Sequence, residues 1–140
     1  MNSVRSRGFS LIELMIVLSV IAILTTVGYP SYMNYVVRSS REAAKSELLQ
    51  FANLQEKIYL NSSSYATSVT TAYNGRADGG LGFTTGTSGD GKYAYTIVPT
   101  VGPTNIYTIT ATPVVTSSQA SDGNLVVSSD GTRAWGSKTW

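Results

Sequence analysis

Residues 9–28 read FSLIELMIVLSVIAILTTVG and contain a single charged side chain, Glu13. At 1.5 Å per residue, a helix of this length extends over about 30 Å, which is the thickness of the hydrocarbon core of a bilayer. The preceding residues, MNSVRSRG, are polar and include Arg5 and Arg7. Because positive charge favours the cytoplasmic side, we expect a single-pass helix whose N-terminus lies in the cytoplasm. A secretory signal peptide fits less well, since the apolar run exceeds about 15 residues and no Ala-x-Ala site follows it.

Glu13 is the residue that a plain membrane anchor does not explain. A carboxylate inside a spanning helix costs about 2.5–3.5 kcal/mol on insertion scales, and it indicates a functional residue with a partner. If the chain were cut after Gly8, Phe9 would carry a free α-ammonium group about one helical turn from Glu13. A neighbouring copy, shifted along its axis, could place its own ammonium on this carboxylate. The alternative is a carboxylate that merely extends to the lipid headgroups.

The segment GFSLIEL at residues 8–14, followed by Pro30, resembles the class III signal of type IV prepilins. The resemblance implies that a prepilin peptidase of the inner membrane cleaves between Gly8 and Phe9 and that the new amine of Phe9 is methylated. It also implies that Glu13 guides each subunit into register during assembly. Further along, QEKIY at 55–59 with SYA at 64–66 resembles a segment of the PilE class of minor pilins.

The apolar helix is expected to continue beyond the membrane segment to about Leu60. Gly28 and Pro30 should bend or loosen it, because proline lacks an N–H and its ring crowds the preceding turn. Beyond them, apolar side chains recur at three- and four-residue steps, with Gln55 interrupting, which predicts a stripe that packs on another part of the chain. The predicted stripe comprises Ala44, Leu48, Phe51 and Ile58.

The remaining residues predict a loop and then an antiparallel sheet. Seven glycines between residues 74 and 91 favour an irregular, flexible loop. Alternating side chains predict two strands joined by residues 102–105, and two shorter strands flank the Asp130-Gly131 hairpin turn. The predicted strands cover 93–98, 107–112, 125–128 and 132–135. The fold class is therefore α+β, a long helix packed on about four antiparallel strands, which the pilin resemblance also implies.

The predicted organisation has five parts. They are a leader peptide (residues 1–8), a transmembrane and filament-core helix (9–30), its amphipathic continuation (31–60), the Gly-rich loop (61–92) and the sheet (93–140). Many pilins close the C-terminal region with a disulfide, but this chain has no cysteine. We therefore expect hydrogen bonds, together with Trp135 and Trp140, to hold the end of the domain.

Composition argues against most enzyme chemistry. The 140 residues include no cysteine and no histidine, so thiol nucleophiles, a histidine base and the commonest transition-metal ligands are missing. No carboxylate pair and no nucleophile with a base stands out, so we expect no enzymatic activity, no cofactor and no metal. Four aspartates adjoin glycines, and turn formation explains them better than calcium binding does. They are Asp78, Asp90, Asp122 and Asp130.

These features predict a structural subunit of a type IV pilus, with the minor class favoured, that assists assembly, twitching motility, adhesion or DNA uptake. The expected partners are other pilin subunits, the prepilin peptidase, the inner-membrane assembly machinery and, before assembly, the bilayer; afterwards the chain would lie in the cell-surface pilus. A pseudopilin of a type II secretion system and a major pilin remain alternatives. The nucleic-acid signal is weak, because the net charge is +2 and the late basic residues Lys92, Arg133 and Lys138 show no stripe interleaved with aromatic residues.

Overall fold

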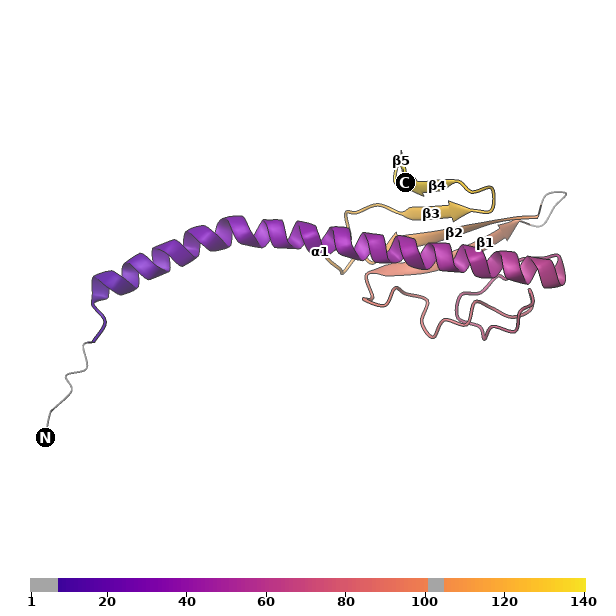
Figure 1. Ribbon diagram of the computed structural model, residues 1–140, viewed down its shortest axis with the longest axis horizontal. Helices are drawn as coiled ribbons and strands as arrows, with labels where there is room; N and C mark the ends of the chain where they lie inside the picture. The colour runs from indigo at the N-terminus through magenta and orange to yellow at the C-terminus, as the bar shows by residue number, and fades with distance from the viewer. Residues whose placement is uncertain (1–7, 101–104) are drawn as a thin grey trace, which may run out of the picture. The chain divides into compact units, whose positions relative to one another are not determined.

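The computed structural model describes residues 8–100 and 105–140. It contains one long helix followed by an antiparallel sheet, which confirms the predicted α+β class (Figure 1). The elements are α1 (Leu11–Ser62), β1 (Tyr93–Thr100), β2 (Ile106–Pro113), β3 (Leu125–Ser128), β4 (Arg133–Trp135) and β5 (Lys138–Thr139). The chain forms two compact units, Met1–Val36 and Val37–Trp140, and α1 contributes residues to both.

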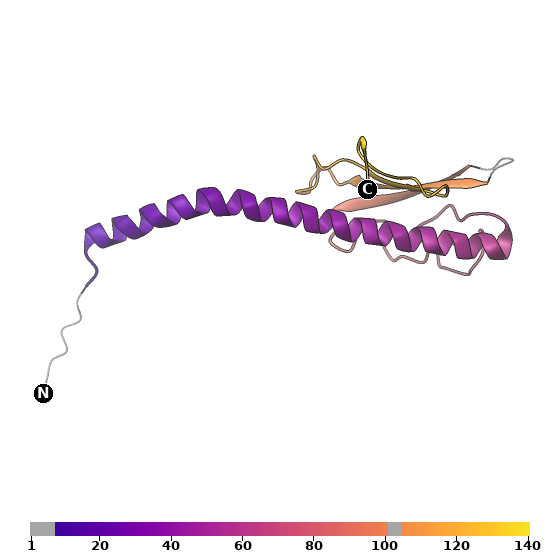
Figure 2. The same cartoon turned by 45° about the horizontal axis from the view of Figure 1, so that its top comes forward.

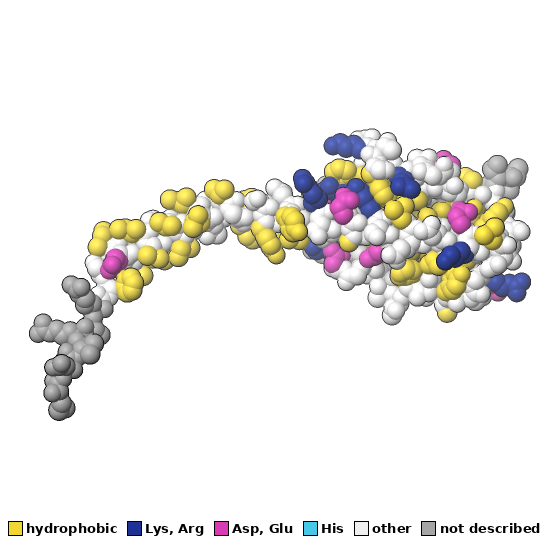
Figure 3. Space-filling view, viewed as in Figure 1, with side chains coloured by type: hydrophobic (Ala, Val, Ile, Leu, Met, Phe, Trp, Pro, Cys, Tyr) yellow, Lys and Arg dark blue, Asp and Glu magenta, His cyan; other side chains and the backbone are white. Residues whose placement is uncertain are grey.

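The described part of the first unit is apolar and uncovered. Its large side chains are exposed on every face of the helix, as Leu14 (55%) and Ile23 (65%) illustrate, and Figure 3 shows hydrophobic side chains along this segment. Such a continuous apolar surface needs lipid or protein to cover it. By length and composition α1 is able to cross a membrane. The helix therefore fits membrane anchoring.

Hydroxyl side chains within this apolar segment bond to the helix backbone. Ser19 donates to the carbonyl of Ile16 (2.7 Å), and Thr25 donates to the carbonyl of Ile21 (2.7 Å). In hydrocarbon every polar group must find a partner inside the protein. These bonds satisfy the hydroxyls without any contact outside the helix.

In the second unit, α1 buries a single face. The buried positions follow at steps of three or four residues, as expected for one side of a helix. They are Ser40, Ala44, Leu48, Phe51, Gln55 and Ile58. Four of them are the apolar positions that the sequence singled out, and each is fully buried. Within the core, the rings of Phe51 and Tyr95 pack edge to face, with their centroids 4.8 Å apart.

The sheet has the strand order β1-β2-β3-β4-β5, with each neighbour antiparallel. It lies along one side of α1 within this unit (Figure 2). Its inward face carries alternate residues of β1 and β2, as the pattern predicted: Tyr93, Tyr95, Ile97, Tyr107, Ile109 and Ala111. β5 is one strand more than the sequence predicted, because two residues give no alternation to detect. The predicted connection over 102–105 lies, apart from Asn105, outside the described residues.

The segment between α1 and β1 is irregular but forms part of the core. Ala66, Val69 and Leu81 are buried, and the backbone N–H of Leu81 donates to the carbonyl of Ser68 (3.0 Å). The glycines here permit close approach of backbone to backbone. A Cβ atom on Gly80 would lie 2.4 Å from the carbonyl oxygen of Thr71.

Candidate functional site

The residues of the predicted processing site lie at the start of α1. Gly8 and Phe9 are exposed and precede the helix, which begins at Leu11. Glu13, in the first turn, accepts a hydrogen bond from the backbone N–H of Ser10 (3.1 Å). A carboxylate at a helix N-terminus is favoured by the helix dipole and by the free N–H groups there. The exposed side chain of Glu13 is therefore open to a further cationic partner.

Gly28 and Pro30, the residues at which a kink was predicted, both lie inside α1. A Cβ atom on Gly28 would meet no described atom within 4 Å. Gly28 is thus exposed, as are the neighbouring residues of this segment.

The two segments that resemble the PilE class, QEKIY and SYA, lie in contact. The side chain of Gln55 donates to the carbonyl of Ala66 (2.8 Å) and accepts from the N–H of the same residue (2.9 Å). The rings of Tyr59 and Tyr65 stack at 4.7 Å. Gln55, which interrupts the apolar stripe in sequence, is fully buried, and its two hydrogen bonds link the helix to the following segment.

Asp122 holds the C-terminal half of the sheet against α1. Its carboxylate accepts hydrogen bonds from Arg41, Tyr93 and Gln119. Its backbone carbonyl accepts the indole N–H of Trp135. Only 3% of the Asp122 side chain is exposed, against 15% for Arg41. The sequence predicts only a turn at Asp122, since nothing in the local pattern indicates its long-range partners.

The environment of Asp122 favours its charged form. Burial alone would raise the pKa of the carboxyl group, but the hydrogen bonds from Arg41, Tyr93 and Gln119 outweigh burial and lower it. Desolvation, followed by the bond to Asp122, raises the pKa of the Tyr93 hydroxyl, which therefore stays protonated as a donor. The network is a charge-assisted link between α1, β1 and the segment before β3.

Basic side chains lie over both tryptophans at this end of the sheet. The guanidinium of Arg41 lies 3.7 Å from the ring centroid of Trp135 and the ammonium of Lys138 5.3 Å from it. At Trp140, the ammonium of Lys45 lies at 5.2 Å and the guanidinium of Arg133 at 5.7 Å. Residues 133–140, RAWGSKTW, already alternate basic and aromatic side chains, a local signal that contradicts the expected lack of interleaving. The fold adds Arg41 and Lys45 of α1 to this group.

Two of these cations are exposed. Arg41 is occupied by Asp122, and Lys45 pairs with Glu42 (2.9 Å). Arg133 and Lys138 lie on the surface, and among the described residues neither forms an ion pair. Figure 3 shows Lys and Arg side chains gathered around β4, β5 and the adjoining part of α1. We call Arg133, Lys138, Trp135 and Trp140 the basic–aromatic surface.

The exposed apolar helix start and the helix-on-sheet unit together define a pilin of the type IV class. Comparison with known proteins specifies the family. The family profile described as "Type IV minor pilin ComP, DNA uptake sequence receptor" matches residues 30–125, and the profile "Prokaryotic N-terminal methylation motif" matches residues 4–29. The chain belongs to this ComP minor pilin family. The predicted type IV minor pilin is confirmed.

Individual relatives are similar over part of their length. "Prepilin peptidase-dependent protein D" of Escherichia coli (strain K12) is 50% identical over 46 residues, which cover 33% of this chain and 29% of that protein. A "Fimbrial protein" of Pseudomonas aeruginosa is 35% identical over 89 residues, 61% of this chain and 54% of that protein. The chain thus spans 29% and 54% of the length of these two relatives.

Proposed function

We propose that this minor pilin binds DNA during uptake and that the basic–aromatic surface is its contact. The observation that carries the proposal is the position of the exposed Arg133 and Lys138 against Trp140 and Trp135. Cations bind the phosphate backbone, and half-buried aromatic rings beside them can pack against sugar or base. The description of the family as a DNA uptake sequence receptor supports the same function.

The N-terminal segment supports a role as a processed pilus subunit. We propose that the prepilin peptidase cleaves between Gly8 and Phe9, that Phe9 is then methylated, and that Glu13 accepts the N-terminal ammonium of a neighbouring subunit. The proposal further places the chain in the bacterial inner membrane before assembly, with the assembly machinery and other pilins as its partners. Head-to-tail contacts that do not close then produce an open filament, without catalysis by this chain.

The test of DNA binding is the salt dependence of affinity. In the double variant Arg133→Gln/Lys138→Gln, affinity for a duplex should fall, and the slope of log K against log salt should decrease by about 2, since two phosphate contacts are lost. Fluorescence anisotropy of the full chain in detergent measures both.

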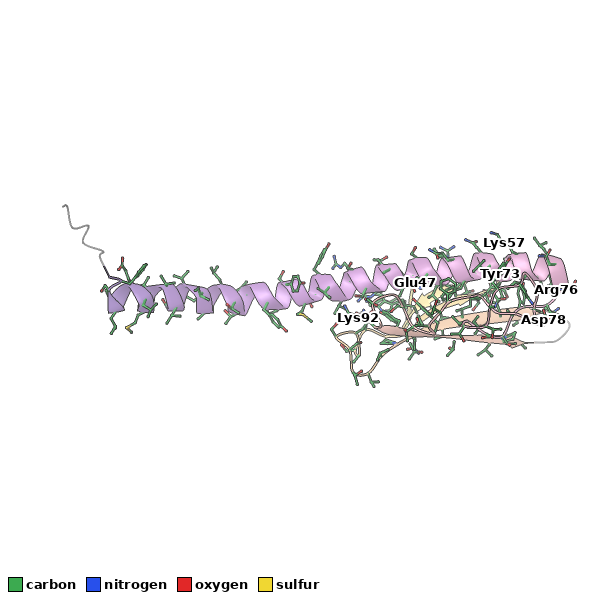
Figure 4. All side chains as sticks on the ribbon, turned by 90° about the horizontal axis from the view of Figure 1, so that it is seen from below. Glu47, Lys57, Tyr73, Arg76, Asp78 and Lys92 are labelled. Atoms are coloured by element: carbon green, nitrogen blue, oxygen red, sulfur yellow. The ribbon has the colours of Figure 1, made fainter. Side chains whose placement is uncertain are left out.

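The matched control is Lys57→Gln/Arg76→Gln, which removes the same charge near the C-terminal end of α1 (Figure 4). It should leave the slope within about 0.5 of the wild-type value. Equal loss in both double variants would show that only net charge matters, and the proposed surface would then be wrong.

A further inference from the structure

A groove next to the basic–aromatic surface has polar groups that the preceding proposal does not use. It lies between α1 and the β3–β4 hairpin, with a volume of about 390 Å³. That is room for about a dozen waters. Its lining includes Asn53 and Glu56 from α1, Ser128 from β3 and Arg133 from β4. Because Arg133 belongs to both sites, the groove continues the basic–aromatic surface.

The groove offers charge of both signs. Arg133 supplies a cation, and Glu56 supplies an exposed carboxylate that the hydroxyl of Tyr65 contacts at 3.5 Å. Tyr107 also lines the groove, and burial, followed by the nearby charge of Glu56, raises the pKa of its hydroxyl. Leu49, Ala52 and Val127 add apolar atoms to the lining.

This distribution matches one nucleotide of DNA. A phosphate fits beside Arg133 but is repelled by Glu56, so a group that lies against this carboxylate must donate hydrogen bonds. Among the bases, guanine presents two adjacent donors, its ring N1–H and its 2-amino group, which suit a carboxylate bidentately. In a duplex this edge is engaged in pairing, and the base must therefore be unpaired or extruded.

We infer that the groove between α1 and the β3–β4 hairpin binds an unpaired guanine of a DNA strand whose backbone lies on Arg133 and Lys138. The inference rests on the proposed DNA-binding function. Glu56 accepts from the Watson–Crick edge of guanine, and Asn53 and Ser128 provide further polar contacts to the base or sugar.

Fluorescence anisotropy of the full chain in detergent tests the inference with two thymine strands. One strand contains a central guanine, and the other has hypoxanthine in its place, which lacks the 2-amino group. The wild type should bind the guanine strand about fivefold more tightly, because hypoxanthine lacks one of the two donors and a hydrogen bond to an exposed carboxylate contributes less than a buried one. In Glu56→Gln this ratio should fall to about 1.

The matched control is Asp78→Asn, which removes one exposed carboxylate from the segment after α1 (Figure 4). It should retain the fivefold ratio. Removing a negative charge raises affinity for every strand alike, so a general electrostatic effect cannot reproduce the loss of discrimination.

The outcomes separate the two proposals. A wild-type ratio near 1, or a Glu56→Gln variant that keeps the ratio, overturns the guanine site even where duplex binding still depends on Arg133 and Lys138. Reduced fibre incorporation of Glu56→Gln with an unchanged ratio would assign the groove to another subunit and also overturns it. Absence of binding to any strand or duplex refutes the proposed function itself.

Discussion

The two units of this pilin differ in how much of α1 they bury. Over residues 11–32, α1 exposes its apolar side chains on all faces, whereas from Val37 to Ser62 it buries a single stripe beneath a sheet. The first segment depends on what surrounds it, either lipid or the helices of other subunits. The second segment carries its own core. Substitutions in the first segment should consequently affect assembly, and substitutions in the second should affect the stability of the fold.

The largest effect is expected at Gly8. A large side chain beside the scissile bond, as in Gly8→Trp, should obstruct the peptidase and leave nearly all of the protein with residues 1–8 attached. Intact mass of the membrane-extracted chain measures this, with Ser3→Trp as a control within the same leader. A product of mature mass from Gly8→Trp would contradict the predicted cleavage site.

A smaller but still severe effect is expected at Glu13. Leaving a neighbour's buried ammonium without its carboxylate costs about 3–5 kcal/mol, so Glu13→Ala should remain in the membrane and largely disappear from sheared fibres. Immunoblots of membrane and fibre fractions compare the two pools. Normal amounts in fibres would mean that Glu13 has no role in assembly, and an equal loss from both pools would indicate instability instead.

Truncation of an apolar side chain should distinguish the two units directly. Phe51→Ala leaves a cavity in the core and should lower the free energy of unfolding of the second unit by about 4 kcal/mol. Leu18→Ala, on the exposed segment, should change it by less than about 0.5 kcal/mol. Thermal denaturation in detergent, followed by near-ultraviolet circular dichroism, measures both. Similar losses in the two variants would contradict this division of roles.

A slightly smaller loss, about 3 kcal/mol near neutral pH, is expected for Asp122→Asn, because Arg41 would keep a largely buried charge without its partner. The folded state lowers the pKa of Asp122. Its stabilising contribution is therefore complete above the unfolded value of about 3.9 and is lost as the pH falls through the folded value. The difference in Tm between wild type and variant should thus narrow on acidification below about pH 4. A difference that stays constant with pH would contradict this role for Asp122.

The sequence predicted the helix, the main strands and the buried stripe because each depends on a local period. Ala44, Leu48, Phe51 and Ile58 follow helical spacing, and Tyr93 to Val98 alternate as a strand does. These patterns arise from burial of one face, so they are visible without knowledge of the partner.

The interactions that hold the C-terminal end could not be predicted in the same way. Arg41 and Asp122 are separated by 81 positions, and their pairing depends on where the connection between β2 and β3 lies against α1. The interleaving of Arg133 with Trp140 likewise depends on the β4–β5 hairpin, whose second strand has only two residues. Trp135 and Trp140 were expected to secure this end, and their indole N–H groups bond to the carbonyls of Asp122 and Ala134.

We propose that the exposed apolar helix packs this chain, once processed, into a filament. Quantitative mass spectrometry of purified fibres tests it most directly, because it reports the N-terminal residue, its methylation and the copy number together. The account predicts a chain that begins at methylated Phe9 and is present at far fewer copies than the main subunit. A chain that retains residues 1–8 and is absent from the fibres would contradict it.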